Sequence, residues 1–393
     1  MQDRIIFHID MDCYYASIEE IYNPKLAMKP LAIAGDPKSR RGVIVTCNYN
    51  ARKYGIHSAM SVWEAKAKCK QLIICPPRYD EYRQISIKVF QFLLKFSYML
   101  QVASIDECYL DVTDKVDLDN AREYAKRIQD ELQKKFKLSC SIGISYNKFL
   151  AKMASKMKKP HGISFIDKDV LKNYIWKKDI NEMYALGNKT ANKLKGIGIL
   201  TIGDFAKLNE KDVRDSIGNH GVKLHQYANG IDFRKVDPEE ISNFKSMGKS
   251  YTFPKNESNK QNLLLVLKEL SRMTSSRIKV RGVLIKTIQM TIKYEDFKIV
   301  TRRKRLNKYF ESEEEINEIA LSLFNEVWNG NPVRLLSISG LDIIKREEEI
   351  KQMDFFSLNK EIDVKTEESN KLANKDDMEY YLKESIRKRF DIG

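Results

Sequence analysis

The chain has 393 residues, 42% of them hydrophobic, which is enough for two to four domains with cores of their own. Its longest apolar stretches, such as the one at 262–267, fall far short of the roughly 20 residues that a membrane-spanning helix needs, so no membrane partner is expected. The formal net charge of +15 favours a polyanionic partner such as nucleic acid.

The amino terminus and the cysteines indicate a reducing compartment. The first residues contain no apolar stretch of the length of a secretory signal, which predicts a cytoplasmic protein. All six cysteines lie within the first 140 residues and none forms a CxxC pair. Reduced thiols are therefore favoured over a disulfide framework or a zinc site.

The hydrophobic patterns of the first half predict the order βαββαβ. Its elements are a strand at 4–10, a helix at 79–99, strands at 101–105 and 108–113, a helix at 119–136 and a strand at 139–145. This is the order of a ferredoxin-like unit, with residues 11–75 inserted after its first strand.

Short helices broken by glycine follow at 184–229 and are typical of helix–hairpin–helix modules, whose backbone N–H groups bind DNA phosphates. A polar stretch with a proline at 237–250 indicates a linker. A second copy of the βαββαβ arrangement is then predicted, with a strand at 251–253, a helix at 259–276, strands near 283–293 and 297–306, a helix at 313–328 and a strand at 333–343. The chain as a whole is predicted to be an α+β protein.

The second copy contains a dense cluster of basic residues. Residues 277–308 contain eleven Lys and Arg but only two acidic residues. From Thr287 onward apolar and polar residues alternate, which places a core on one face of a strand and a polar, phosphate-tracking surface on the other. A basic face that is merely solvated is the alternative. The DNA-binding candidates are Lys286, Lys293, Arg302, Arg303, Lys304 and Arg305.

Three acidic residues are expected to meet at one edge of the first sheet. Asp10 ends the first strand, and Asp106 and Glu107 begin the third. These two strands are usually antiparallel neighbours in a βαββαβ sheet. Buried carboxylates repel one another unless cations compensate, and two Mg²⁺ ions in such a site can clamp the oxygens of a phosphoryl transfer. The alternative is that Asp106 and Glu107 are turn residues and that Asp10 caps a helix.

Four motifs resemble a known family in both order and spacing: "FHIDMDCYYASIEE" at 7–20, "GVIVTCNYNARKYGIHSAM" at 42–60, "SIDECYLDVT" at 104–113 and "NKFLAKMASKMKKPHG" at 147–162. The family is the Y-family DNA polymerases, and the motifs are most similar to the DNA polymerase IV class. The resemblance implies a right-hand architecture and template-directed addition of deoxynucleotides across damaged bases. The implied parts are a palm (1–10 and 76–165), fingers (11–75), a thumb (166–234), a linker (235–248) and a little finger (249–345).

The resemblance also implies roles for single residues. Asp10, Asp106 and Glu107 match the catalytic metal-binding carboxylates, with the carbonyl of Met11 completing the shell of two Mg²⁺ ions. Asp12 is expected to cap the following helix instead. The triphosphate would be bound by Thr46, Tyr49, Arg52 and Lys159, the first three of which can share one helical face by their spacing.

The two adjacent tyrosines are expected to have different roles. Tyr15 matches the residue that excludes ribonucleotides by a clash, whereas Tyr14 is expected in the core or the base pocket. One departure from the family lies in the thumb, where Ala185 replaces the first glycine of a glycine-x-glycine turn.

The final segment, 346–393, is net acidic and contains a peptide similar to those that bind the bacterial sliding clamp: Gln352, Met353, Asp354, Phe355 and Phe356. The alternative is that its two phenylalanines fold back onto the little finger. The implied partners of this monomeric enzyme are primer–template DNA, deoxynucleoside triphosphates and the sliding clamp.

Two other functions fit parts of the pattern. A nucleotide cyclase could use the same sheet and carboxylates, but it would not need the helix–hairpin–helix segment or the second basic domain. A DNA-binding scaffold would keep the basic surfaces without any need for the three acids to converge. Primer extension with Mg²⁺ distinguishes all three.

Overall fold

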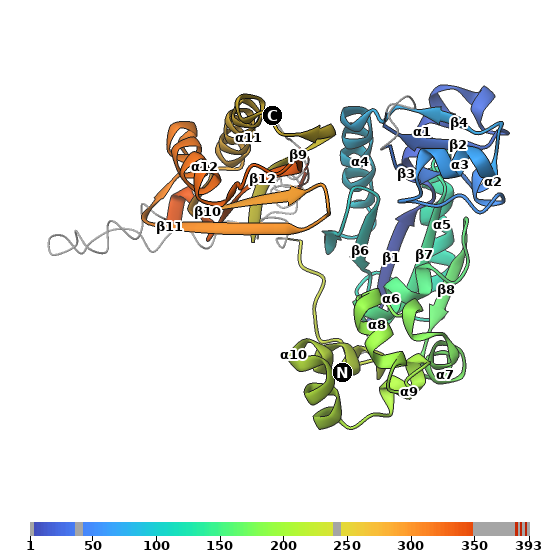
Figure 1. The fold of residues 1–393 in the computed structure, drawn as a ribbon. Helices are drawn as coiled ribbons and strands as arrows, with labels where there is room; N and C mark the ends of the chain where they lie inside the picture. Colours follow the sequence, from blue (N-terminus) through green and yellow to red (C-terminus); the bar gives the residue numbers. More distant parts are fainter. Residues whose placement is uncertain are drawn as a thin grey trace, which may run out of the picture. The chain divides into compact units, whose positions relative to one another are not determined.

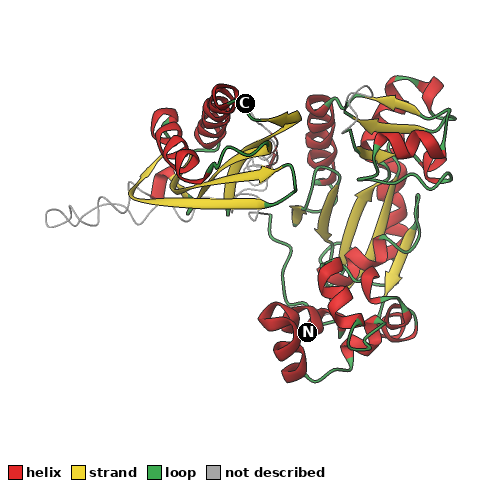
Figure 2. Cartoon of the chain, in the orientation of Figure 1, coloured by secondary structure: helices red, strands yellow, loops and turns green. Residues whose placement is uncertain are grey.

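The computed structural model describes residues 4–35, 42–238 and 245–348, together with Leu382, Lys383, Ile386 and Phe390. The chain divides into two compact units, Met1–Ile241 with Lys375–Ile386 and Ser242–Asn374 with Arg387–Gly393. Both contain helices and sheets, which confirms the α+β class (Figures 1 and 2). Within the described ranges, no helix is long and apolar enough to cross a membrane.

The first unit is organised around a five-stranded sheet with the order β5-β6-β1-β7-β8. Its strands are β1 (Ile6–Met11), β5 (Leu100–Val102), β6 (Glu107–Asp111), β7 (Cys140–Ser145) and β8 (Ile163–Ile166). As predicted, the first and third strands of the βαββαβ order are antiparallel neighbours. The fifth strand, β8, was not predicted, because its four residues give too short an apolar run to be distinguished from a loop.

The two faces of this sheet are covered by different helices. They are α4 (Tyr79–Leu93), α5 (Ala121–Phe136) and α6 (Lys148–Ser155). Phe7 points to the face of α5, where it meets the Tyr124 ring, whereas His8 points to the face of α6 and contacts Ser155. Side chains alternate along a strand, so Asp10 shares the α6 face with His8.

Small residues let α6 lie close to the sheet. On β7, the positions opposite Ile6, His8 and Asp10 are Ser145, Gly143 and Ser141. These side chains occupy little space between the strand and the helix. The face of the sheet that carries Asp10 is therefore covered by a helix in direct backbone contact with Gly143.

The insertion between β1 and α4 forms a small subdomain with a three-stranded sheet of order β3-β2-β4. Its elements are α1 (Tyr14–Tyr22), a 3-10 turn (Pro24–Leu26), β2 (Leu31–Ala34), β3 (Ile44–Cys47), α2 (Tyr49–Arg52), α3 (Val62–Lys68) and β4 (Ile73–Cys75). A buried cluster that includes Ile44, Met60 and Leu72 forms its core.

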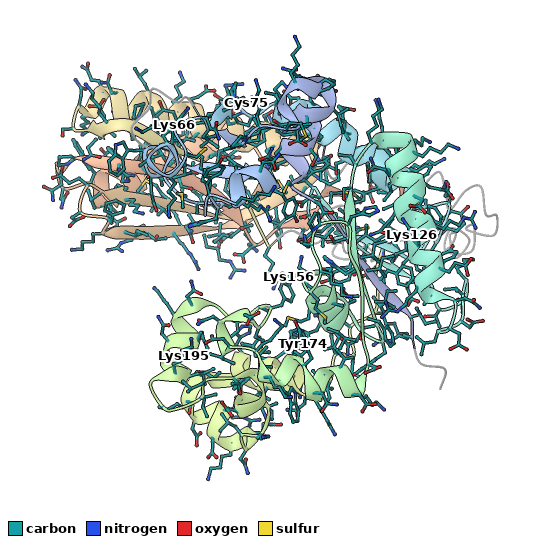
Figure 3. The ribbon with its side chains drawn as sticks, turned by 90° about the vertical axis from the view of Figure 1, so that its right-hand side faces the viewer. Lys66, Cys75, Lys126, Lys156, Tyr174 and Lys195 are labelled. Carbon is teal, nitrogen blue, oxygen red and sulfur yellow. The ribbon has the colours of Figure 1, made fainter. Side chains whose placement is uncertain are left out.

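A helical segment follows β8 and includes Tyr174 and, on α8, Lys195 (Figure 3). Its elements are α7 (Lys168–Asn173), two 3-10 turns (Ile175–Lys177 and Ile180–Glu182), α8 (Asn188–Lys195), α9 (Ile202–Ala206) and α10 (Glu210–Ala228), which is interrupted at Gly218. Ala185, at the position where the resemblance led us to expect glycine, has a φ of 68°. A left-handed conformation costs a residue with a Cβ about 1–2 kcal/mol, so this turn keeps the glycine geometry at an energetic cost.

The second unit has the predicted βαββαβ order of elements. They are β9 (Ser246–Glu257), α11 (Lys260–Val280), β10 (Val283–Tyr294), β11 (Ile299–Phe310), α12 (Glu313–Val327) and β12 (Val333–Leu341), followed by β13 (Ile344–Lys345). It is nevertheless not a copy of the first sheet, because its strands are arranged β11-β10-β12-β9.

The charges explain this difference. β10 buries Ile288, Met290 and Ile292 against the helices, so it occupies a central position. The middle of β11 has charged, exposed residues on both faces, which suits only the edge of a sheet. The prediction of two equal copies was therefore wrong in strand order, although it was right in the sequence of elements.

The predicted linker is shorter than the range assigned to it. Val236 is buried with Ile6 and Tyr109, and β9 already begins at Ser246. Residues 239–244 between them lie outside the described part of the chain.

Gly143 tests the close packing of α6. A Cβ at this position would lie 2.0 Å from the carbonyl oxygen of Ala151 and 2.3 Å from the backbone nitrogen of Ser155. We expect Gly143→Ala to lower the free energy of unfolding of the first unit by at least about 1–3 kcal/mol, because backbone must move to admit the methyl group. Thermal unfolding followed by circular dichroism measures this. Gly35→Ala is the matched control, since a Cβ there meets nothing within 4 Å; equal midpoints for both variants would contradict the prediction.

Candidate active site

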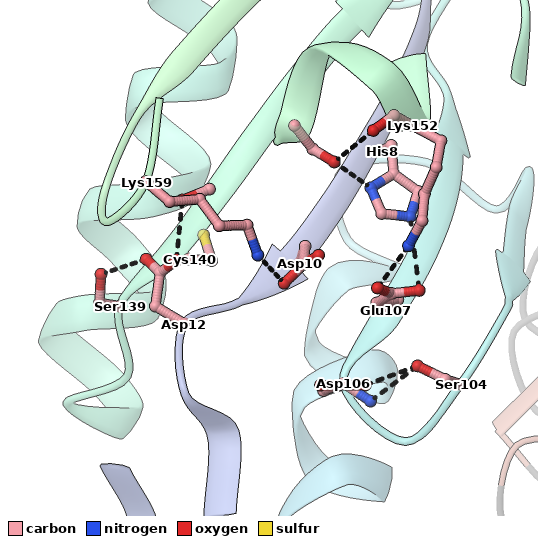
Figure 4. Close-up of polar contacts among 12 residues, drawn as sticks. His8, Asp10, Asp12, Ser104, Asp106, Glu107, Ser139, Cys140, Lys152 and Lys159 are labelled. Carbon is pink, nitrogen blue, oxygen red and sulfur yellow. Dashed lines mark hydrogen bonds and ion pairs between the residues drawn. The ribbon is translucent and has the colours of Figure 1, made fainter. Parts of the chain in front are cut away.

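The three predicted carboxylates lie at one edge of the first sheet (Figure 4). Asp10 at the end of β1 is paired in register with Glu107 at the start of β6. The backbone N–H of Met11 donates to the carbonyl of Asp106 at 2.9 Å, which holds the turn before β6 against β1. A pocket opens at this edge, lined by Asp10, Met11, Cys13, Tyr14, Tyr15, Val45, Thr46, Arg52, Ser58, Ile105, Asp106, Glu107 and Lys159.

Asp10 is paired with a lysine. The Lys159 ammonium donates to Asp10 Oδ1 at 2.5 Å, from the loop that follows α6. Burial raises the pKa of the Asp10 carboxyl to about 7, although the charge of Lys159 opposes the rise. Burial likewise raises the pKa of Asp106, against a hydrogen bond of 2.5 Å that Ser104 Oγ donates to its Oδ1.

The Glu107 carboxylate contacts two residues that the sequence analysis did not identify, Lys152 and His8. Lys152 on α6, whose side chain is only 6% exposed, forms an ion pair with Glu107 Oε1. His8 Nε2 lies 3.8 Å from Glu107 Oε2, and His8 Nδ1 is 2.8 Å from Ser155 Oγ. Burial opposes the charge on Glu107, but its interactions with His8 and Lys152 outweigh burial and lower its pKa. Burial also lowers the pKa of His8 to about 4, so this imidazole is neutral at pH 7.

The sequence contains a weak signal for both residues. His8 lies two positions before Asp10 and so shares its face of β1, and Lys152 lies in the "NKFLAKMASKMKKPHG" motif. That α6 lies across the sheet at this point cannot be read from spacing alone. Their contacts with Glu107 are therefore visible only in the fold.

The donor set suits Mg²⁺, which prefers oxygen ligands and completes its shell with waters and substrate phosphates. Among the residues that the structure describes, no three His, Cys, Asp or Glu side chains form a closed cluster for a metal ion. Asp10 and Glu107 are instead paired with Lys159 and Lys152. A site that shares its ions with a phosphate substrate does not need a complete cage of protein ligands.

The two adjacent tyrosines differ in exposure. Tyr14 is 3% exposed, and its hydroxyl donates to the carbonyl of Tyr82 at 2.8 Å. Tyr15 is half-buried and stacks on the Tyr82 ring, with centroids 4.4 Å apart and planes inclined by 15°. The Tyr79 ring meets Tyr15 edge-on. The ring of Tyr15 is thus fixed by packing while it lines the pocket.

The predicted triphosphate residues come from two elements. Thr46 lies on β3, whereas Tyr49 and Arg52 lie on α2, so the expectation that all three share one helical face was wrong. The helix α2 begins only after Asn48, because the Asn48 side chain caps it by accepting a hydrogen bond from the backbone N–H of Ala51. Thr46 therefore lies before the helix. Thr46 and Arg52 line the pocket. The Arg52 guanidinium lies over the Tyr49 ring, 4.8 Å from its centroid.

Asp12 does not cap α1 as predicted. That helix begins after Cys13 without a side-chain cap, and Cys13 has a φ of 49°. The Asp12 carboxylate instead accepts hydrogen bonds from Ser139, Ser141 and the backbone of His161. A cap was predicted from position alone, and the competing partners come from residues more than 120 positions away.

The basic residues of the second unit lie on both faces of its sheet. Arg303 and Arg305 are opposite Gln289 and Thr287 of β10, on the face away from the helices. Arg303 Nε donates to Gln289 Oε1 at 2.6 Å. This open face continues across β12 and β9 with Ser337, Ser339, Ser250 and Gly248.

Other candidates are placed differently. Arg302 and Lys304 are opposite the buried Met290 and Ile288, and Arg302 lies 3.5 Å from Glu326 of α12. The remaining two pack against aromatic rings, with Lys286 Nζ 5.0 Å from the centroid of Tyr309 and Lys293 Nζ 4.6 Å from that of Phe297. The predicted clamp-binding peptide at 352–356 lies outside the described residues.

Comparisons with known proteins identify the family. Residues 9–156 match the model of the impB/mucB/samB family, and residues 244–355 match the model of its C-terminal domain. DNA polymerase IV 1 of Bacillus subtilis is 42% identical over 382 residues, which cover 97% of this chain and 92% of the relative. DNA polymerase IV of Bacillus anthracis is 44% identical over 90% of this chain and 86% of its own length.

A solved structure agrees with these matches. A Y-family DNA polymerase chimera of Dbh and Dpo4 superposes with a TM-score of 0.78 at 26% identity, over 87% of this chain and 99% of the chimera. Membership of this family decides against the nucleotide cyclase and the non-enzymatic scaffold. The chain belongs to the impB/mucB/samB family and is a Y-family DNA polymerase.

Proposed function

We propose that this Y-family polymerase adds deoxynucleotides to a DNA primer at the edge of the first sheet, in the synthesis of DNA across damaged bases. The observation that carries the proposal is the pocket in which Asp10, Asp106 and Glu107 face Tyr15, Thr46, Arg52 and Lys159. A phosphoryl transfer needs metal ligands on one side and donors for a triphosphate on the other.

The protein's part in the reaction is to bind and orient. Asp10, Asp106, Glu107 and the Met11 carbonyl would hold two Mg²⁺ ions, which when bound supply charge stabilisation to the attacking and leaving oxygens. Thr46, Tyr49 and Arg52 donate to the triphosphate. Lys159 lines the same pocket, so its ammonium can leave Asp10 and pair with a phosphate oxygen of the triphosphate instead. Lys152 stays buried and keeps Glu107 oriented.

The domain roles follow from the family. We assign the palm, fingers, thumb and little finger to the ranges given above, with the linker reduced to the stretch before Ser246. The open face of the second sheet, with Arg303 and Arg305, is proposed to follow the DNA backbone. The sliding-clamp partner, the monomeric state and the cytoplasmic location remain predictions from the sequence.

Asp106 tests the metal site. We expect Asp106→Ala to lower the rate of nucleotide addition by about a hundredfold or more, because the charge stabilisation at the reacting phosphate is lost. DNA affinity should change little, since it comes from phosphate contacts elsewhere. Single-nucleotide insertion and fluorescence anisotropy measure the two quantities. Asp130→Ala, an exposed residue of α5, is the control, and insertion by Asp106→Ala at the rate of that control would contradict the assignment.

Tyr15 tests the discrimination between sugars. We expect Tyr15→Ala to insert ribonucleotides far more readily while retaining deoxynucleotide insertion, because a ring under the sugar leaves no room for a 2′-hydroxyl. A shift of about 1 Å in the reacting atoms costs on the order of a hundredfold in rate. Tyr14→Ala should not relax the selection, since Tyr14 is held in the core by Tyr82. The measurement is the ratio of kcat/KM for matched ribo- and deoxynucleoside triphosphates. A ratio that Tyr15→Ala leaves unchanged would show that Tyr15 does not exclude ribonucleotides.

Arg303 and Arg305 test the open face of the second sheet. We expect each change to Ala to weaken DNA binding and to reduce the slope of log Kd against log salt by about one, as for the loss of one phosphate contact. Anisotropy titrations at several salt concentrations measure this. Arg272→Ala is the control, because Arg272 is an exposed residue of α11 that is paired with Glu269. If Arg272→Ala reduces the slope equally, the salt dependence of DNA binding comes from the overall charge of the protein and not from the open face of the second sheet.

A further inference from the structure

Asp12 is a buried acid to which the proposed chemistry gives no role. It is 3% exposed and follows the catalytic strand directly. Its carboxylate accepts three hydrogen bonds of 2.8 Å, from the hydroxyls of Ser139 and Ser141 and from the backbone N–H of His161. All three partners donate in these contacts, so the Asp12 carboxylate acts only as an acceptor in them.

The bond to His161 holds the loop that carries Lys159. This loop turns tightly, because His161 has a φ of 56° and a Cβ at Gly162 would lie 2.0 Å from the carbonyl oxygen of Lys158. The backbone of His161 is anchored two residues from Lys159. Ser141 is the register partner of Asp10 on β7, so the same carboxylate ties the loop to the strand beside the catalytic acid.

Asp12 also lies near a side chain of α2. The Tyr49 hydroxyl lies 3.5 Å from Asp12 Oδ1, at the outer limit of a hydrogen bond. The backbone of Asp12 is fixed as well, since its N–H donates to the carbonyl of Ser139 and its carbonyl accepts from Ser17 Oγ at 2.7 Å. The next residue, Cys13, has a left-handed backbone conformation with a φ of 49°, which is unfavourable for a residue with a Cβ and needs such anchoring.

We propose that Asp12 is a positioning residue for the triphosphate of the incoming nucleotide. Its carboxylate fixes the loop that carries Lys159, so that the Lys159 ammonium is held at the pocket, and it lies next to the Tyr49 hydroxyl of α2. This inference rests on the proposed function, in which Lys159 and Tyr49 bind the triphosphate. Asp12 itself touches neither the substrate nor the metal ions.

The test is Asp12→Asn. This change keeps the shape of the side chain but replaces one acceptor oxygen by an N–H₂ group, which cannot accept a hydrogen bond from Ser139, Ser141 or His161. The dissociation constants of a deoxynucleoside triphosphate and of the matching monophosphate are measured on a primer that ends in a dideoxynucleotide, so that no chemistry occurs. Charge-assisted hydrogen bonds contribute about 1.5–3 kcal/mol, which corresponds to about tenfold to hundredfold. We expect the triphosphate to bind that much more weakly, while binding of the monophosphate and of DNA changes little.

Steady-state kinetics adds a second readout. KM for the triphosphate should rise more than kcat falls, whereas a general loss of structure would lower both activity and DNA binding. Asp130→Asn, the same chemical change at an exposed site, should leave all values unchanged. Should Asp12→Asn not fold, Ser139→Ala and Ser141→Ala each remove one donor, and a weaker loss of the same kind is expected of both.

Lys159→Ala separates this inference from the function on which it rests. If Lys159→Ala weakens triphosphate binding but neither Asp12→Asn nor the two serine variants do, Asp12 has no positioning role and the triphosphate site stands. An equal loss for triphosphate and monophosphate in Asp12→Asn also overturns the inference. If Lys159→Ala itself leaves triphosphate binding unchanged, the assignment of the triphosphate site fails.

Discussion

The site depends on one constraint, the register of β1 between β6 and β7. Because side chains alternate along a strand, Asp10, Glu107 and Ser141 share a face only while Asp10 is opposite both partners. A slip of one residue would turn Asp10 toward the face of α4 and α5. The register is secured by Phe7 and Ile9, which are buried and would be forced onto the other face by the same slip. The core that stabilises the sheet thus also aligns the acids proposed to bind the metal ions.

Bringing these acids together is electrostatically unfavourable, and two lysines of different exposure offset it. Lys159 is partly exposed in the pocket and pairs with Asp10, whereas Lys152 is buried beneath Glu107. Burial still raises the pKa of Asp10 to about 7, so one lysine only partly compensates for the loss of water. An exposed cation can exchange partners at low cost, and a buried one cannot. The difference in burial therefore separates Lys159, the proposed triphosphate ligand, from Lys152, which supports Glu107.

Much of this could be predicted from the sequence, and the failures have physical causes. The order βαββαβ and two short motifs were enough to bring Asp10 and Glu107 to neighbouring strands, because antiparallel pairing follows from topology. Strand order in the second unit was missed, although the charges on both faces of β11 mark an edge strand. The partners of Asp12 could not be predicted, since they depend on how a loop and a strand meet after folding.

The same close packing serves both stability and the site. α6 reaches the sheet because Ser141, Gly143 and Ser145 leave room for it. From that position α6 directs Lys152 to Glu107, and the loop after it brings Lys159 to Asp10 and the backbone of His161 to Asp12. A bulkier residue on β7 would move all three contacts together. The pocket is therefore built on a helix packed against a central strand, and this rigid support fixes the positions of the side chains that line it.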